Sequence, residues 1–318
     1  MMDGIINIYK EGGYTSHDVV AKLRGILHTK KIGHTGTLDP MAEGVLPICV
    51  GAATRLSEML SDHDKEYEAE MVLGSTYDTL DITGVLQETR EVMSTKEEIT
   101  DAIRSFVGGY DQVPPMYSAK KVGGQKLYDL ARSGKVVERK PVWVDIYGID
   151  ILDMDIPRCR IRVRCGKGTY IRSLIDDIGR KLGCGAAMSA LTRTRSGDLA
   201  IDSAHRLAEV ERAAAEGRLS DFTVSLESLF SGLPKIDADG AANKLLLNGN
   251  VLSAAMLKLP GSPASNSGTD GPGMKNAPSP AAEEGARFRM YDSSGRFAAV
   301  YEYKTAGNIF KPYKMFLN

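Results

Sequence analysis

The chain has 318 residues, of which 42% are hydrophobic and 25% charged, and its formal net charge is −1. This length favours two domains, and the composition is that of an ordinary globular protein. No apolar run approaches the roughly 20 residues that a membrane-spanning helix needs, and no signal-peptide pattern is present, so we expect a cytoplasmic protein. The cysteines lack Cys-x-x-Cys or zinc spacing and are predicted to be reduced structural thiols: Cys49, Cys159, Cys165 and Cys184.

The N-terminal half is predicted to alternate between strands and helices. Two segments have capping-box spacing, Thr15–Asp18 and Thr95–Glu98, and each precedes an apolar period that indicates a helix. The first helix should continue to about His28, and the second should stop at Gly108-Gly109. Lys65–Gly74 alternates between apolar and polar residues, which predicts a strand. The other elements expected here are a strand at 4–9 and a short helix at 54–61.

The rest of the chain begins with an irregular basic loop at 112–121. Its expected elements are a helix near 124–132, strands within 142–165, helices at 170–182 and about 203–215, a helix at 240–248 and a hairpin at 286–303. A composition break near Gly232-Leu233-Pro234 suggests a domain boundary. Residues 260–285 are rich in Pro, Gly, Ser, Ala and Asn and predict a flexible insert, because this composition cannot bury enough apolar surface to offset its ordering entropy.

Basic residues are concentrated in two segments, 117–140 and 158–172, although the net charge is close to zero. In 158–165, arginines alternate with apolar residues, so one strand face should be basic, while acidic residues gather elsewhere, at 62–70. This distribution favours an RNA-binding surface, and the helix start near Gly166–Arg172 could receive an anion. A merely solvated basic face is the alternative. The candidate RNA-binding residues are Lys120, Lys121, Lys126, Arg164 and Lys167.

The most informative segment is the loop at 31–47. It places one carboxylate, Asp39, before Pro40, which restricts Asp39 to an extended or turn geometry. Glycines at 33, 36 and 44 allow a large partner to approach the backbone closely. An apolar run of buried-strand type follows, and a stiff loop beside a core strand is a common place for catalytic residues. On these residues alone, a glycine-rich turn with a helix-capping Asp is an equal alternative.

Several motifs, taken together and in order, resemble the TruB family of RNA pseudouridine synthases, bacterial type. The matching segments are Gly33–Pro40 with Gly44–Pro47, Asp64–Tyr67, Asp78–Gly84, Pro115–Lys120, Gly168–Arg172 and Leu191–Arg193. The similarity covers about residues 3–230, and the remainder is similar only in outline to the family's small RNA-binding PUA-type domain. The insert at 260–285 departs from the compact form of that domain.

The resemblance implies roles for individual residues. Asp39 would be the nucleophile, and Arg172 would pair with it and lower its pKa. Tyr67 would stack on the uracil near C5, while Tyr170 and Leu191 would line the base pocket. His34 would occupy the gap left by a flipped uridine. The reaction breaks the N1–C1′ bond and rejoins the uracil through C5, so it requires no metal or other cofactor. Whether Asp39 attacks the sugar or the base, or removes a sugar proton, stays open.

The resemblance also implies an α+β fold with a mixed, mostly antiparallel central sheet and flanking helices, followed by a small β-rich PUA-like domain. Residues 1–231 would form the catalytic domain, with a thumb-like RNA-clamping insertion at about 112–140, and residues 232–318 the PUA-like domain. The expected activity is formation of pseudouridine at position 55 in the TΨC loop of tRNA, by a monomer that needs no protein partner. The alternatives are a relative that uses a guide RNA, and a non-catalytic RNA-binding or RNA-folding module.

Overall fold

The computed structural model describes residues 3–118, 120–135, 137–258 and 283–317. In this part of the chain, the elements up to the basic loop are β1 (Gly4–Lys10), α1 (Ser16–Ile26), β2 (Ile32–His34), β3 (Glu43–Val50), α2 (Ser57–Ser61), β4 (Lys65–Leu73), β5 (Ser75–Tyr77), β6 (Leu86–Thr89), α3 (Lys96–Arg104) and β7 (Tyr110–Gln112). They are followed by β8 (Lys121–Val122), β9 (Gln125–Lys126), α4 (Leu127–Arg132), β10 (Val142–Val144), β11 (Ile146–Asp155), β12 (Arg158–Cys165), α5 (Ile171–Leu182), β13 (Ala186–Ser196), β14 (Leu199–Ala200), α6 (Leu207–Ala215) and β15 (Thr223–Ser225). The last elements are β16 (Lys235–Asp237), α7 (Gly240–Leu247), β17 (Leu252–Ser253), β18 (Arg287–Tyr291), β19 (Phe297–Lys304) and β20 (Ile309–Met315).

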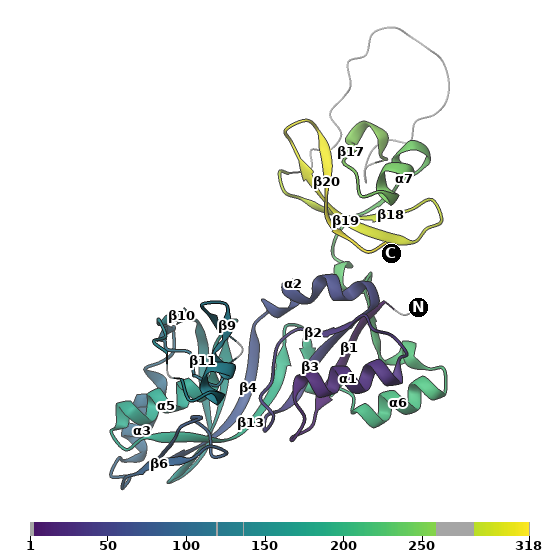
Figure 1. Ribbon diagram of the computed structural model, residues 1–318. Coiled ribbons are helices and arrows are strands. Elements are labelled where there is room, and N and C mark those ends of the chain that lie inside the picture. The colour runs from purple at the N-terminus through teal and green to yellow at the C-terminus, as the bar shows by residue number, and fades with distance from the viewer. Residues whose placement is uncertain (1–2, 119, 136, 259–282, 318) are drawn as a thin grey trace, which may run out of the picture. The chain divides into compact units, whose positions relative to one another are not determined.

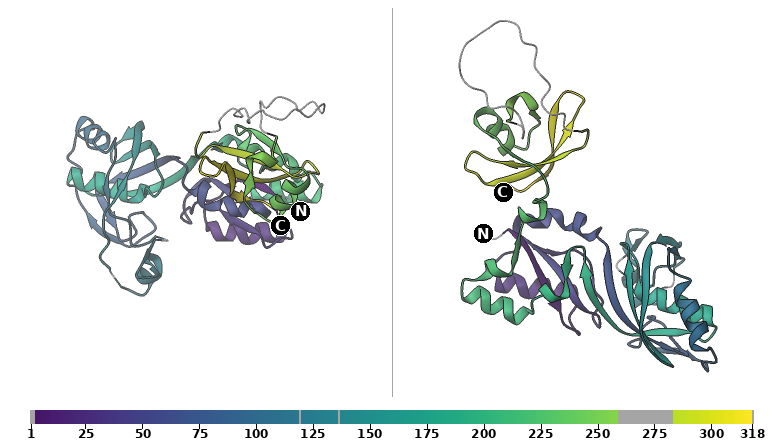
Figure 2. Two further views of the ribbon diagram at one scale, coloured as in Figure 1. Left: turned by 90° about the horizontal axis from the view of Figure 1, so that it is seen from above. Right: turned by 180° about the vertical axis from the view of Figure 1, so that it is seen from behind.

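A large mixed sheet organises most of the chain, in the order β11-β12-β4-β13-β3-β1-β15. The pairs β11–β12, β12–β4 and β4–β13 are antiparallel, whereas β13 and β3 are parallel. Figure 1 shows that β4 and β13 run from the part of the sheet near α1 and α6 to the part near α3 and α5, and both views of Figure 2 agree. The expected mixed, mostly antiparallel sheet with flanking helices is confirmed.

Local sequence signals account for several of these elements. Thr15 and Asp18 form the expected capping box before α1, and Thr95 and Glu98 form the second before α3. Along β4 the residues alternate between buried and partly exposed, so the predicted apolar face, which includes Tyr67, packs into the core. Helix α5 ends at Gly183, whose φ of 77° suits glycine.

Four predicted elements differ from the structure. The helix expected to stop at Gly108-Gly109 is α3, which ends at Arg104. The segment expected as a helix at 124–132 begins as a hairpin, because Gly123 and Gly124 adopt positive φ between β8 and β9, and only Leu127–Arg132 is helical. The segment expected as one short helix at 54–61 is a 3-10 helix, Gly51–Leu56, followed by α2. Near 203–215, the α-helix starts only at Leu207.

The basic face of β12 is not an isolated positive surface. The register of the sheet places Arg160, Arg162 and Arg164 opposite Glu70, Glu68 and Glu66 of β4. Glu68 pairs with Arg160 and Arg162, and Glu70 pairs with Arg158. The expectation that the acidic residues of 62–70 lie elsewhere is therefore wrong, since cross-strand pairing brings the two sets together.

The described chain forms two compact units: one contains Ile6–Cys49 and Leu56–Phe222, and the other contains the chain up to Ile5, Val50–Arg55 and the chain from Thr223 onward. The second unit holds a small sheet in the order β16-β18-β19-β20-β17. Its buried core includes Ile236, Met290, Tyr301 and Phe310. The hairpin expected at 286–303 is β18 and β19, and it gains a third strand, β20. Most of the insert expected at 260–285 lies outside the described residues.

All four cysteines are buried and free. Among the described residues, no helix combines the length and the apolar composition that crossing a bilayer requires.

Candidate active site

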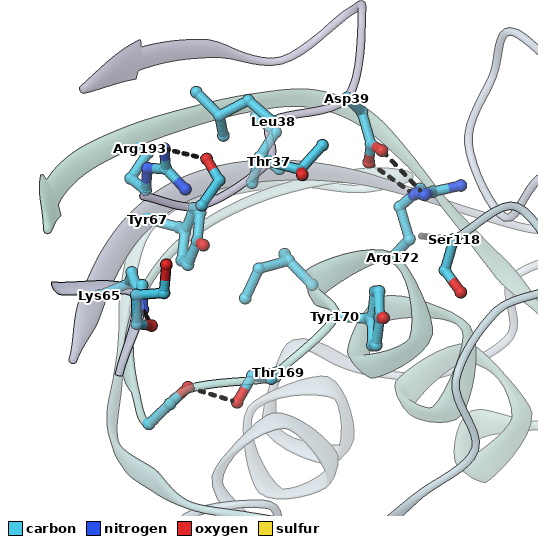
Figure 3. A pocket seen from close by; sticks show the side chains of 16 residues that line it. Thr37, Leu38, Asp39, Lys65, Tyr67, Ser118, Thr169, Tyr170, Arg172 and Arg193 are labelled. Atoms are coloured by element: carbon cyan, nitrogen blue, oxygen red, sulfur yellow. Dashed lines mark hydrogen bonds and ion pairs between the residues drawn. The ribbon is translucent and has the colours of Figure 1, made fainter. Parts of the chain in front are cut away.

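Five of the predicted site residues meet at a hollow of about 270 Å³ in the larger unit. Its wall combines the loop before β3, strand β4, the start of α5 and strand β13 (Figure 3). Of the residues expected to act in catalysis or base binding, the structure brings together Asp39, Tyr67, Tyr170, Arg172 and Leu191.

Asp39 is held by a two-pronged contact with Arg172. Nε of Arg172 lies 2.9 Å from Oδ2 of Asp39, and Nη2 donates to Oδ1 at 3.0 Å. The remaining donors of Arg172 bind the carbonyl oxygens of Thr79, at 2.9 Å, and Tyr117, at 2.8 Å. The side chain of Arg172 is only 6% exposed, whereas that of Asp39 is 33% exposed. The guanidinium is thus fixed from several sides and aims a partly accessible carboxylate into the hollow.

A second carboxylate, Asp81, lies on the other side of the same guanidinium. Its Oδ2 is 3.6 Å from Nη1 of Arg172, and its side chain is 6% exposed. Oδ1 of Asp81 accepts hydrogen bonds from Thr79 and from the backbone and hydroxyl of Thr83. One guanidinium therefore contacts two carboxylates, and the charge of Lys10 also acts on Asp39.

The pKa of Asp39 is raised above its ordinary value, with burial as the largest cause. The guanidinium of Arg172 opposes the rise, and the charge of Asp81 adds to it. The expectation that Arg172 lowers the pKa of Asp39 is confirmed for the effect of Arg172 itself, but desolvation outweighs this effect and the net pKa is raised.

Tyr67 projects from β4 on the opposite side of the hollow from Asp39 and Arg172 (Figure 3). Tyr67 is 9% exposed. Burial raises the pKa of the Tyr67 hydroxyl, and a hydrogen bond with Arg193 opposes this rise. Leu191, which is buried, pairs with Ala69 across β13 and β4 and so presents an apolar side chain to the same space.

The start of α5 is fixed by a side chain from β7. The Gln112 amide accepts from the backbone N–H of Tyr170 at 2.8 Å and donates to the Tyr170 carbonyl at 3.0 Å. This clamp holds Tyr170 and Arg172 at the pocket. It also occupies the N–H of Tyr170, so this donor of the helix start is not open to an anion.

Gly44, in the segment that follows Asp39, is required for a steric reason. Its φ is 98°, and a Cβ there would lie 2.3 Å from the carbonyl oxygen of Arg193. Only glycine permits this close approach of the loop to β13. On the other flank of the loop, the buried amine of Lys10 donates to the carbonyl of Pro40 at 3.2 Å, and burial lowers the pKa of Lys10 to about 8.

His34 is not part of the pocket wall. It is half-buried on β2, and its Nδ1 accepts from the N–H of Gly36 at 3.4 Å. Lys120, Arg164 and Lys167 are exposed, and Lys167 forms an ion pair with Asp62 at 2.8 Å. The side chains of Lys121 and Lys126 lie outside what the structure describes.

Sequence reasoning missed several polar residues of the wall: Lys65, Ser118 and Arg193. Ser118 is buried, and its hydroxyl has no hydrogen-bond partner among the described residues. A signal for Arg193 was present in the Leu191–Arg193 motif, but a charged residue three places from the end of a strand of small and polar residues gives no indication of burial.

The chain is similar to known proteins in sequence and in fold. Residues 24–171 match a family model described as TruB family pseudouridylate synthase (N terminal domain), and residues 172–231 match the tRNA pseudouridylate synthase B C-terminal domain. The protein named tRNA pseudouridine synthase B of Lachnoclostridium phytofermentans is 45% identical over 327 residues, which cover 99% of this chain and 100% of that protein. The protein of the same name from Bacillus pumilus is 39% identical over 323 residues, covering 99% and 98%.

Among solved structures, the archaeal box H/ACA sRNP Nop10–Cbf5 complex matches with a TM-score of 0.66 and 25% identity, covering 99% of this chain and 86% of that chain. These similarities, together with the large mixed sheet and the small C-terminal sheet, define a pseudouridine synthase with a PUA-like domain. More specifically, the chain belongs to the TruB family of pseudouridylate synthases, which are pseudouridine-forming enzymes.

Proposed function

We propose that this protein isomerises uridine 55 in the TΨC loop of tRNA to pseudouridine. The observation that carries the proposal is the carboxylate of Asp39, held by two hydrogen-bonding contacts from buried Arg172 and facing Tyr67 across a small hollow. The names of the relatives, tRNA pseudouridine synthase B, support tRNA as the substrate.

Asp39 is the reactive group in this proposal. As a carboxylate, it assists cleavage of the N1–C1′ bond by attack on the sugar or the base, or by removal of a sugar proton. Arg172 orients it, since a planar guanidinium with fixed partners on Thr79 and Tyr117 leaves the carboxylate little freedom. The reaction is an isomerisation that needs no external oxidant or reductant and transfers no phosphate, so acid–base and nucleophilic side chains suit it.

The hollow is shaped for a nucleotide taken out of the RNA stack, which costs a few kcal/mol. The base enters beside Tyr67, whose ring stacks on the uracil near C5, and Tyr170 and Leu191 line the same space. His34, which lies outside the wall, occupies the gap left in the RNA.

The remaining RNA contacts are assigned to basic side chains, to the segment 112–140 and to the C-terminal domain. The RNA phosphates are contacted by Lys120, Lys121, Lys126, Arg164 and Lys167. Residues 112–140 act as the RNA clamp, and residues 232–318 form the PUA-like domain that follows the catalytic domain at 1–231. The protein acts in the cytoplasm as a monomer without a protein partner.

The experiment is a reaction with unmodified tRNA transcript and no other protein or RNA. Pseudouridine is mapped by carbodiimide labelling and primer extension, and a transcript with cytidine at position 55 is the matched control. The proposal expects one modified position, in the T loop, only in the uridine transcript. Modification that requires an added guide RNA would favour the guide-dependent alternative, and binding without modification would favour a non-catalytic module.

A further inference from the structure

Two buried cations lie beside Tyr67 without a carboxylate partner. Arg193 is 1% exposed, and its Nε and Nη2 donate to the carbonyls of Val45, at 2.7 Å, and Gly36, at 3.1 Å. Lys65 is 8% exposed, and its amine donates to the carbonyls of Ser61 and His63, each at 2.5 Å. In the described part of the chain, neither forms an ion pair, whereas Arg172 contacts two carboxylates.

This arrangement is costly for the empty protein. Buried charges are ordinarily paired, and carbonyl dipoles offset only part of the loss of hydration. The two cations also disfavour each other: after burial itself, the charge of Arg193 is the largest cause that lowers the pKa of Lys65. The wall near Tyr67 therefore holds two positive charges without an ion pair among the described residues, although the charges of Asp62 and Asp64 act on Lys65 from farther away.

The hollow is consequently polarised. Arg193, Tyr67 and Lys65 lie on one side, and Asp39 and Arg172 lie on the other (Figure 3). With Asp81 included, the second side carries two carboxylates for one guanidinium. A uridine whose C1′ faces Asp39 would direct its uracil ring toward the positive side.

We infer that Arg193 and Lys65 form an electrostatic subsite for the uracil anion released when the glycosidic bond breaks. The inference rests on the proposed function and adds two residues to it. The electron pair of the C1′–N1 bond goes to the uracil, whose negative charge spreads over N1 and the carbonyl oxygens, and C1′ becomes electron-deficient. When C5 then bonds to C1′, the ring supplies that electron pair, the C5 proton is lost and N1 gains a proton.

An RNA phosphate is the other anion with suitable charge, but burial argues against it. Phosphates remain on the strand outside the hollow, where exposed cations such as Lys120 are available. A side chain that is 1% exposed, like that of Arg193, can be approached only from within the hollow. A flipped planar base is the part of the nucleotide that enters it.

The test compares tRNA carrying uridine with tRNA carrying 5-fluorouridine at the target position. Fluorine withdraws electrons and stabilises the uracil anion without help from the protein, so cleavage of this base should depend less on the two cations. Single-turnover consumption of each nucleoside is followed after nuclease digestion. The variants are Arg193→Gln and Lys65→Gln, with Arg193→Lys to retain the charge. The matched control is Arg195→Gln, an exposed arginine on the same strand, paired with Glu66.

We expect Arg193→Gln to slow consumption of uridine on the order of 100-fold, the scale for removing a group that stabilises developing charge. The loss with 5-fluorouridine should be clearly smaller, Lys65→Gln should show the same preference, and Arg193→Lys should recover part of the uridine rate. Arg195→Gln should leave both rates unchanged. Because Arg193 also holds the Gly36 loop, the ratio of the two losses, rather than either loss alone, is the informative quantity.

Equal losses for both bases in both Gln variants would overturn the inference and leave a purely structural role. A fall in tRNA affinity, together with a salt dependence reduced by about one ion per variant, would assign the cations to a phosphate and overturn it as well. Wild-type protein that modifies neither tRNA would overturn the proposed function together with the inference. If the wild-type protein is active and only the expected behaviour of the variants is missing, the inference fails while the proposed function stands.

Discussion

Replacing Arg172 by lysine keeps the positive charge but should leave the carboxylate of Asp39 without a fixed orientation. In the structure Arg172 directs two donors to Asp39 and two to the carbonyls of Thr79 and Tyr117. A lysine amine carries its donors on one nitrogen, so it cannot serve the carboxylate and both carbonyls at once. Displacement of a reacting group by about 1 Å can cost on the order of 100-fold in rate, and we expect a loss of that size.

The same substitution should lower stability, because a buried carbonyl left without its donor costs about 1–3 kcal/mol. The assay is the single-turnover rate of pseudouridine formation, with tRNA affinity and thermal unfolding measured in parallel. Affinity should change by less than roughly threefold, which is under 1 kcal/mol. Arg180→Lys is the control, since Arg180 lies on the same helix but is 71% exposed. An Arg172→Lys variant with the rate of the wild type would refute the positioning role of the guanidinium.

Three further outcomes are expected. Burial raises the pKa of Asp39 above its ordinary 3.8, and the carboxylate must be ionised to act. The single-turnover rate should therefore begin to fall on acidification while the pH is still above 3.8. A rate that stays unchanged down to pH 3.8 would contradict this expectation. Gly44→Ala should destabilise the fold by a few kcal/mol in denaturant unfolding, because its Cβ would meet the Arg193 carbonyl, whereas Gly25→Ala, with open space in α1, should not; equal effects would contradict the steric argument. Lys120→Gln should reduce the slope of log affinity against log salt by about one, and an unchanged slope would remove Lys120 from the RNA surface.

Sequence patterns identify elements whose signals are local. The capping boxes at Thr15 and Thr95 place α1 and α3, and the alternation along 65–73 places β4 together with its buried face. Strand β13 was not expected, although it lies between β4 and β3, because its small and polar residues show no clear alternation. Its strand form comes from pairing on both sides, which is a tertiary effect.

In the functional site, too, some features could be predicted from the sequence and others depend on the folded structure. The pairing of Asp39 with Arg172, 133 positions away in the sequence, was expected only through the family resemblance, and the structure shows it. The pairing of the β12 arginines with Glu68 and Glu70 depends on strand register, which composition does not determine. The net rise in the pKa of Asp39 depends on the balance of burial against charge, and this balance exists only once the chain is folded.

The central claim is that the carboxylate of Asp39 carries the chemistry, and Asp39→Asn tests it most directly. The amide keeps the size of the side chain but cannot act as a nucleophile or accept a proton in the same way. With unmodified tRNA transcript, the variant should form no detectable pseudouridine at the T-loop position, while its tRNA affinity stays within about tenfold, or 1.4 kcal/mol, of the wild type. Substantial turnover by a tRNA-binding Asp39→Asn variant would contradict the assignment.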